Sequence, residues 1–249
     1  MQGANSEVAS RAAEFYDARW QQQGAELTRQ RRLRISFILE SIARFKNSRA
    51  ATILDLGCGC GWMAPFLSPY GKVTGIDFAP NSITFAEQTY GSHGKFVLAQ
   101  PNQTITKQLG ISSFDIVVSS EVIEHTVDQS AFLGEINSLL RPEGICILTT
   151  PNGNVWEEFE RKFKADCQPI ENWLTPDQCS RTVSEAGFEI LRHVGGVFPG
   201  LRLGRRRWMQ HRLVTAAFRT VGLSGLHGHI CRSNALYQFL VAKKLPPTV

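Results

Sequence analysis

The chain has 249 residues, of which 43% are hydrophobic and 20% are charged. This length supplies one substantial hydrophobic core with additions, and it excludes two full-sized enzymatic domains. The uncharged stretches are shorter than the roughly 20 apolar residues of a membrane-spanning helix, and the N-terminal residues lack the apolar region of a signal peptide, so we expect a soluble cytoplasmic protein.

The net charge of +5 is unevenly distributed along the chain. Residues 190–249 contain ten Lys or Arg and no Asp or Glu, whereas residues 51–189 contain eight basic and seventeen acidic residues. A basic segment attracts phosphate-bearing substrates, nucleic acid or an anionic membrane surface, so this distribution bears on partners and not on the fold.

The six cysteines are scattered. Cys58 and Cys60 form the one close pair, and their CxC spacing differs from the CxxC spacing of zinc sites. We therefore expect six reduced thiols, most of them buried.

Residues 9–46 predict one or two amphipathic helices, because apolar residues recur there at near-helical spacing. From Thr52 onward, short apolar runs alternate with helical stretches, which predicts an α/β fold with a doubly wound, mostly parallel sheet covered by helices on both faces. The seven expected strands are Thr52–Leu56, Val73–Asp77, Lys95–Ala99, Phe114–Ser119, Ile145–Thr149, Phe188–Val194 and Ala235–Val241.

Two helices have readable ends. Asp128 is an expected N-cap, and Pro142 with Gly144 is expected to stop the helix that follows. Thr175 and Gln178 have the spacing of a capping box, before a helix that ends at Gly187.

A glycine-rich run, DLGCGCG at residues 55–61, leads from the first expected strand into a helical stretch. An open α/β sheet binds nucleotide-like ligands at this place, and glycines let the backbone approach a ligand closely. A dinucleotide fingerprint needs its third glycine one position later, where this chain has Trp62, so the pattern disfavours NAD. Asp55 suits a ligand with a cationic amine, and Asp77, at the end of the second strand, can accept hydrogen bonds from two ribose hydroxyls.

The run DLGCGCGWMAPFLSPYGKVTGID, followed by FDIVVSSEVIEH, LLRPEG and ILTTPN, resembles the class I S-adenosylmethionine-dependent methyltransferases, within them the branch of the ubiquinone-biosynthesis O-methyltransferases. The resemblance covers about residues 12–194, and its motifs are specific for the cofactor rather than for the substrate. We expect one methyltransferase domain over residues 1–249. Its parts are an N-terminal helical cap (1–50), a cofactor-binding core (51–194), a basic helical insertion (195–232), and a last strand and tail (233–249).

The resemblance implies a cofactor site made of Arg34, Asp55, Gly57, Gly59, Asp77, Phe78, Gln100 and Ser120. In such a site the glycine loop lies against the methionine part, Asp77 holds the ribose and Phe78 packs on the adenine. Arg34 would pair with the cofactor's carboxylate, for which a planar guanidinium is suited, unless it lies on a solvated helix face. Gln100 stands where the wider family has an acidic residue that accepts from the adenine amino group.

The segment after the fourth strand carries the candidate catalytic residues Glu121, Glu124 and His125. Methyl transfer needs a positioned acceptor and, for a hydroxyl, removal of a proton, so His125 is the candidate general base. If the segment is helical, the three side chains share a face that could also hold a divalent cation, an arrangement we do not favour. The alternative is that the two glutamates bind backbone amides and His125 only shapes the pocket.

Two further segments bear on the acceptor. Thr149–Gly153 differs from the NPPY-type motif that is used for exocyclic amines of bases, which disfavours nucleic acid as a partner. Trp156 and Trp173 either line the substrate side or serve ordinary packing.

Leu201–Arg219 contains six arginines among apolar residues and predicts a cationic amphipathic helix. Three interpretations stay open: a lid or docking surface for a phosphate-bearing acceptor, peripheral contact with an anionic membrane, or a solvated or homodimer face.

Together these features predict a methyltransferase that uses S-adenosylmethionine, forms S-adenosylhomocysteine, and methylates a hydroxyl on a small or carrier-linked acceptor such as a sugar, quinone or phenol. The alternatives are N-methylation of a small amine, or a non-catalytic protein that binds the cofactor or RNA.

Overall fold

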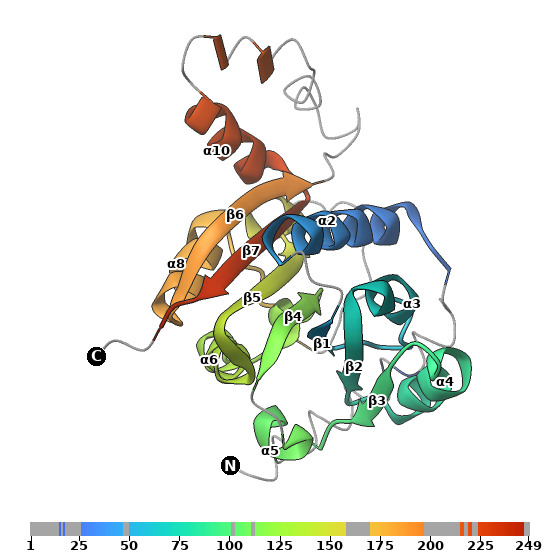
Figure 1. The fold of residues 1–249 in the computed structure, drawn as a ribbon. Coiled ribbons are helices and arrows are strands. Elements are labelled where there is room, and N and C mark those ends of the chain that lie inside the picture. The colour runs from blue at the N-terminus through green and yellow to red at the C-terminus, as the bar shows by residue number, and fades with distance from the viewer. Residues whose placement is uncertain are drawn as a thin grey trace.

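A single seven-stranded sheet organises the described part of the chain (Figure 1). The computed structural model describes residues 15, 17, 26–46, 50–100, 103–110, 113–157, 170–196, 215–216, 219–220 and 224–246. The strands are β1 (Ala51–Leu56), β2 (Gly71–Asp77), β3 (Lys95–Leu98), β4 (Phe114–Ser120), β5 (Leu140–Pro151), β6 (Phe188–Gly196) and β7 (Tyr237–Lys244).

The strand order is β3-β2-β1-β4-β5-β7-β6. Strands β1 to β5 pair in parallel, and β7 lies antiparallel between β5 and β6. The expected mostly parallel seven-stranded sheet is therefore confirmed. The order reverses between β1 and β4, and in open sheets of this kind the crevice at that switch point, at the carboxyl ends of the strands, is where ligands bind.

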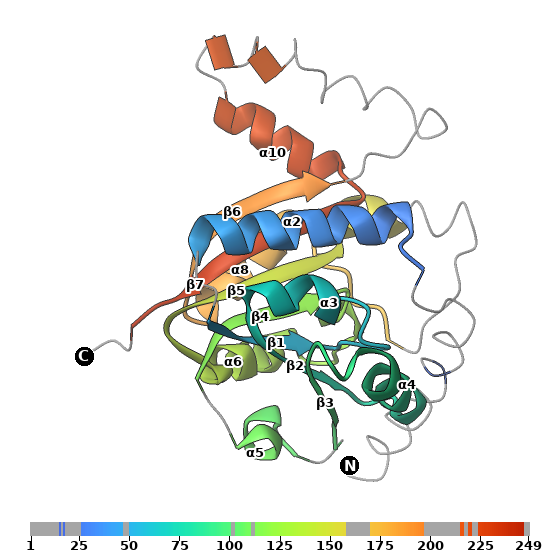
Figure 2. The ribbon, with the colours of Figure 1, turned by 45° about the vertical axis from the view of Figure 1, so that its right-hand side comes forward.

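Helices cover both faces of the sheet (Figure 2). Their bounds are α2 (Arg29–Phe45), α3 (Ala64–Leu67), η1 (Ser68–Tyr70), α4 (Pro80–Tyr90), α5 (Ile105–Leu109), η2 (Ile123–His125), α6 (Gln129–Leu139), α8 (Pro176–Glu185) and α10 (Ser224–Asn234). One core lies between the sheet and α2, α3 and α4, and the other lies between the sheet and α6 and α8. Because successive strand residues point to opposite faces, Ile53 joins the first core and Leu54 the second.

The expected helix caps at Asp128 and Thr175 are confirmed. The carboxylate of Asp128 accepts from the N–H of Ala131 at 2.9 Å, and Thr175 with Gln178 forms a complete capping box at the start of α8. Gly187 follows the end of α8 at φ 84°, a backbone conformation that favours glycine.

Helix α6 ends before Pro142 and Gly144, but these two residues lie in a strand. The helix ends at Leu139, and the next residues already belong to β5. Leu140 is extended, fully buried and paired with Phe114, and a register shift follows before Ile116 meets Ile145. Burial of Leu140 against the second core therefore starts the strand five residues earlier than the sequence pattern predicts.

The N-terminal cap is confirmed where the structure describes it. Helix α2 begins after Thr28, whose hydroxyl accepts from the N–H of Arg31 at 3.3 Å. Before residue 26 only Phe15 and Asp17 are described, and both are helical. The carboxylate of Asp17 accepts from the backbone N–H of Ser82 at 3.1 Å, which ties this segment to the first turn of α4.

The expected cationic helix at Leu201–Arg219 lies outside the described residues, apart from Thr215, Ala216 and Arg219. The described end of the insertion forms α10, which packs against β6. None of the helices in the described ranges is long and apolar enough to cross a membrane. The boundaries of cap, core and insertion stay predictions.

The cysteines that the structure describes are free thiols. Four of these five are buried, as expected.

His193 on β6 links α8 to β7. Its Nε2–H donates to Oε1 of Gln238 at 3.1 Å, because the amide nitrogen of Gln238 already donates to the carbonyls of Pro151 and Leu174. Nδ1 then accepts from the hydroxyl of Ser180 at 2.9 Å. Burial lowers the pKa of His193 to about 4, with the charge of Arg232 adding to the effect, so the imidazole in this network is neutral at pH 7.

The network predicts a pH-dependent stability. The unfolded chain takes up a proton on His193 below its ordinary pKa of 6.5, whereas the folded chain does so only near pH 4. The stabilisation is therefore present above pH 6.5 and is lost as the pH falls towards 4, by on the order of 2–3 kcal/mol. Chemical denaturation of wild type and His193→Gln at pH 7 and pH 4.5 should show a smaller pH dependence in the variant. His93→Gln, at an exposed imidazole, is the control, and an equal pH dependence in all three proteins would contradict the prediction.

Candidate active site

A cavity of about 590 Å³ lies at the carboxyl edge of the sheet. Eight of the eleven residues expected in the site line it: Arg34, Gly57, Asp77, Phe78, Ser120, Glu121, Glu124 and His125. Asp55, Gly59 and Gln100 are not among its lining residues. The fold thus brings the start of α2, the end of β2 and the segment after β4 to one place.

The glycine loop, residues 57–61, needs its glycines for steric reasons. Gly57, Gly59 and Gly61 have φ values of 77°, 52° and 75°, which side chains rarely adopt. A Cβ on Gly57 would also collide with Cγ2 of Val122. The N–H of Gly57 donates to the carbonyl of Ile76 at 2.9 Å, so the loop is fixed over the end of β2.

Asp77 closes the loop from the end of β2. One carboxylate oxygen accepts from the N–H of Gly59 at 2.8 Å, and the other accepts from the N–H of Ala79 at 3.0 Å. Burial raises the pKa of Asp77, and these backbone donors oppose the shift. A carboxylate has about four acceptor positions, so the group retains capacity for hydroxyl donors from the cavity.

Asp55, at the end of β1, is fully buried, and neither of its carboxylate oxygens has a partner among the described residues. Burial raises its pKa to about 8, and the charge of Asp77 adds to the shift. The hydroxyl of Ser119, on the adjacent β4, is also buried and unpartnered within the described chain. Unsatisfied buried polar groups are rare in folded proteins, and those at Asp55 and Ser119 fit a polar, cationic ligand nearby.

Two arginines of α2 line the cavity, and only Arg34 was expected. Its guanidinium lies 5.7 Å from the ring centroid of Tyr237, and Nη1 is 3.9 Å from Oε2 of Glu121. Nε of Arg34 is buried without a partner in the described residues. Arg31 stacks on Trp62 with its guanidinium carbon 5.4 Å from the ring centroid. Neither Arg31 nor the two aromatic partners carries a pattern that singles it out in the sequence.

The chain turns sharply at Glu121, which has a left-handed φ of 59°. Its N–H donates to the carbonyl of Thr149 at 2.8 Å, and its Oε1 accepts from the Thr149 hydroxyl at 3.0 Å. The hydroxyl of Ser120 lies 2.8 Å from the hydroxyl oxygen of Thr149. Only Ile123–His125 is helical, as a 3₁₀ turn, so the expectation that Glu121, Glu124 and His125 could share one helical face is corrected.

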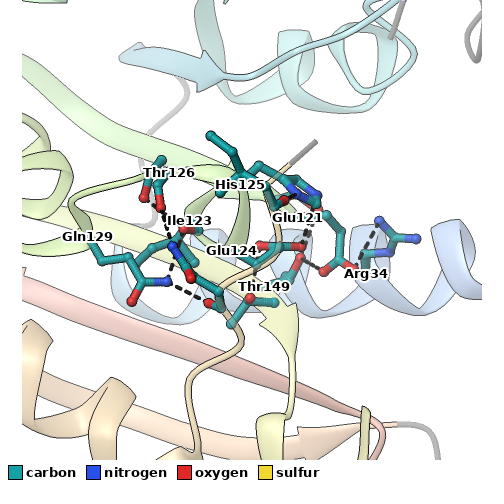
Figure 3. A network of polar contacts seen from close by, with 12 residues as sticks. Arg34, Glu121, Ile123, Glu124, His125, Thr126, Gln129 and Thr149 are labelled. Atoms are coloured by element: carbon teal, nitrogen blue, oxygen red, sulfur yellow. Dashed lines mark hydrogen bonds and ion pairs between the residues drawn. The ribbon is translucent and has the colours of Figure 1, made fainter. Parts of the chain in front are cut away.

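Glu124 is buried beside this turn (Figure 3). Its Oε2 accepts from the hydroxyl of Thr150 at 2.9 Å, and its Oε1 lies 3.8 Å from Nε2 of His125. Burial raises the pKa of Glu124 well above its usual range, and the charge of Glu121 adds to this. Across the described ranges no group of three His, Cys, Asp or Glu is arranged to hold a metal ion.

The ring of His125 is oriented by a backbone carbonyl. Its Nδ1 lies 2.8 Å from the carbonyl oxygen of Ile170. Because a carbonyl only accepts, Nδ1 carries the proton, and Nε2 keeps its lone pair on the ring of a residue that lines the cavity. This is the tautomer that a general base requires.

The remaining walls are aromatic. Trp156 and Trp173, singled out in the sequence, both line the cavity, together with Tyr237. The rings of Trp156 and Tyr237 lie 5.4 Å apart between centroids. Gln100, just after β3, exchanges backbone hydrogen bonds with the side chain of Gln108. Its contact with the adenine stays a prediction.

Comparison with known proteins agrees with this geometry. A family model described as a methyltransferase domain matches residues 27–193. The ubiquinone biosynthesis O-methyltransferase of Rhodopseudomonas palustris (strain BisB5) is 30% identical over 194 residues, which cover 70% of this chain and 76% of the relative. Its counterpart from Bradyrhizobium sp. (strain ORS 278) is 27% identical over 186 residues, covering 67% and 72%.

Solved structures share the fold. A putative sarcosine dimethylglycine methyltransferase from Galdieria sulphuraria superposes with a TM-score of 0.59 at 16% identity, covering 87% of this chain and 88% of the other. An S-adenosylmethionine-dependent methyltransferase from Mesorhizobium loti gives 0.56 at 14% identity, with coverage of 83% and 96%. Taken with the family match and the relatives, these results show that the chain belongs to the family of S-adenosylmethionine-dependent methyltransferases.

Proposed function

We propose that the protein methylates a hydroxyl oxygen on a small or carrier-linked acceptor, with His125 as the general base. The orientation of His125 carries this proposal, because the carbonyl of Ile170 keeps the proton on Nδ1 and leaves Nε2 able to accept. The relatives that are named as O-methyltransferases support an oxygen atom as the methyl acceptor.

The residues around the cavity suit the parts of S-adenosylmethionine. Asp77 would accept from the ribose hydroxyls, with Phe78 beside the adenine and Gln100 near its amino group. Asp55 would neutralise the amine at the glycine loop, near Gly57, Gly59 and Ser120, and Arg34 would bind the carboxylate. The cofactor supplies a methyl group that is already activated on a sulfonium.

The chain then has three tasks in the transfer. The aromatic walls of Trp156, Trp173 and Tyr237 orient the acceptor and exclude water. Nε2 of His125 takes the hydroxyl proton as the oxygen attacks. Oε1 of Glu124 lies 3.8 Å from Nε2, so the imidazolium that results favours the charged form of the Glu124 carboxyl and is stabilised by it.

A sugar, quinone or phenol meets these requirements, because each offers a hydroxyl on a compact body that fits between aromatic walls. A phosphate-bearing or carrier-linked acceptor would also gain from the excess of positive charge after residue 190. Contact with an anionic membrane is a further prediction for the arginine-rich segment.

The two buried aspartates of the cofactor site should respond differently to substitution. Asp55→Asn should raise the Tm of the free protein at pH 8, because it removes an unpaired buried carboxyl whose folded-state pKa is about 8. Each kcal/mol gained in the free energy of unfolding corresponds to a rise in Tm of about 3 °C for a chain of this size. The same change should weaken S-adenosylhomocysteine binding by about 10- to 100-fold, since a charged partner of the amine is lost. Scanning calorimetry and titration calorimetry measure the two effects.

The pH dependence has a definite sign. The folded Asp55 carboxyl holds its proton up to about pH 8 and the unfolded one only to about 3.8, so this group makes the wild type less stable as the pH rises between these values. Asp77→Ala is the matched variant. It leaves the N–H groups of Gly59 and Ala79 without their acceptor, so it should lower both Tm and affinity. A lowered Tm in Asp55→Asn would contradict the assignment.

Replacement of the proposed base separates oxygen from nitrogen acceptors. His125→Gln should lower kcat for hydroxyl acceptors by about 100-fold or more, because the glutamine side chain has no basic nitrogen to take the proton. The assay follows S-adenosylhomocysteine release with a catechol, a sugar and a primary amine as probes, across pH 6–9. His229→Gln, on the exposed side of α10, is the control. Turnover of the amine alone, unaffected by His125→Gln, would identify an N-methyltransferase instead.

A further inference from the structure

The carbonyl that orients His125 belongs to a segment outside the core motifs. Residues Ile170–Leu174, which we call the acceptor strap, run past η2 and reach the cavity with the ring of Trp173. The strap therefore contributes the carbonyl that binds the proposed base. It also contributes part of the cavity wall against which the methyl acceptor would lie. Both contributions depend on the contacts that hold the strap in place.

Asn172 fastens the middle of the strap to the segment that carries His125. Its backbone N–H donates to the carbonyl of Glu124 at 2.7 Å, and its side-chain Nδ2 donates to the carbonyl of Thr126 at 3.0 Å. These carbonyls flank His125 directly in the chain. The contacts of Asn172 therefore fix the distance between the strap and the backbone on either side of His125.

Gln129 makes the same connection from the first turn of α6. Its Nε2 donates to the carbonyl of Asn172 at 2.7 Å and to the carbonyl of Ile123 at 3.2 Å. Figure 3 shows this side chain reaching back from α6 towards η2. One amide group thus bridges the strap and the 3₁₀ turn.

The far end of the strap is fixed independently. The carbonyl of Leu174 accepts from the N–H of Gly153 at 3.0 Å and from Nε2 of Gln238 at 2.7 Å. A Cβ on Gly153 would lie 2.8 Å from the carbonyl oxygen of Trp173, so the strap passes too close for a side chain there. Loss of the side-chain contacts of Asn172 and Gln129 leaves the backbone bond from Asn172 to Glu124 and the attachment at Leu174, so it should loosen the Ile170 end rather than free it.

We propose that Asn172 and Gln129 are positioning residues, which hold the acceptor strap so that the Ile170 carbonyl fixes His125 in the Nδ1–H tautomer. The catalytic meaning of this arrangement rests on the proposed function, in which Nε2 takes the proton. The tautomer itself is a property of the His125 ring and can be measured without any methyl acceptor. An imidazole that loses this carbonyl can adopt the Nε2–H tautomer, in which the nitrogen intended to accept a proton already carries one.

The test is long-range ¹H–¹⁵N NMR of the full chain labelled at histidine, with S-adenosylhomocysteine bound, at a pH where the His125 ring is neutral. The His125 signals are assigned by their absence in His125→Gln. The wild type should show the Nδ1–H tautomer. Asn172→Ala/Gln129→Ala should show a mixture with the Nε2–H tautomer, together with a kcat for the active hydroxyl probe that is lower by about tenfold and an unchanged affinity for S-adenosylhomocysteine.

Asn137→Ala is the matched control. Asn137 also lies on α6, and its side-chain amide also donates to a backbone carbonyl, that of Ala186 at 3.0 Å, but the bond joins α6 to the end of α8. It should leave the tautomer and kcat unchanged. If the double variant does not fold, the single variants Asn172→Ala and Gln129→Ala provide the same comparison.

Two results would overturn the inference: an Nε2–H tautomer in the wild type, or an unaltered Nδ1–H tautomer in the folded variants. The proposed function fails in a different way. In that case the tautomer shifts as described, while kcat is insensitive both to the shift and to His125→Gln, which removes His125 from the reaction and with it the catalytic role of the strap.

Discussion

The backbone turn at Glu121 is the constraint on which both halves of the site depend. A non-glycine residue at φ 59° costs on the order of 1–3 kcal/mol, and here the backbone and the side chain are both bonded to Thr149. After the turn, the side chain of Val122 packs against Gly57, where no Cβ would fit. The short helix that carries His125 begins at the next residue. Because one turn contacts the glycine loop and begins the acceptor side, the loop and the proposed base cannot shift independently of each other.

Carboxyl groups are buried at this turn and at the end of the strand beside it. Glu124 is buried beside Glu121, and Asp55 is buried at the end of the neighbouring β1, with raised pKa values at Glu124 and Asp55. Such groups are costly in the free protein, because burial opposes their charged forms. A ligand that carries an amine and a sulfonium supplies the missing positive charge. The unfavourable electrostatics of the free site therefore favour binding of the cofactor that the family uses.

The sequence predicted what depends on local periodicity or on steric need. Short apolar runs located the seven strands, and the glycine run with Asp77 located two residues that line the cavity, Gly57 and Asp77. The early start of β5 was missed because Pro142 and Gly144 resemble a turn, although burial of Leu140 keeps them in a strand. The helical face of Glu121, Glu124 and His125 was wrong because nothing in the residue type of Glu121 signals a left-handed turn. The bond from His125 to Ile170 joins residues 45 apart through a backbone carbonyl, which has no sequence pattern at all.

The same division explains why the relatives identify the cofactor more firmly than the acceptor. The glycine loop, Asp77 and the turn at Glu121 sit at strand ends, whose positions follow from the sheet itself. Trp156 and Trp173 lie between β5 and α8. Tyr237 starts the antiparallel β7 and is the one of the three that lies beyond the residues matched by the family model. These walls are held by a few side chains, Asn172, Gln129 and Gln238 among them, rather than by the strand ladder. Two proteins can therefore share the first set of constraints and differ in the second, and under the proposed function the strap and the start of β7 are where differences in the methyl acceptor are expected.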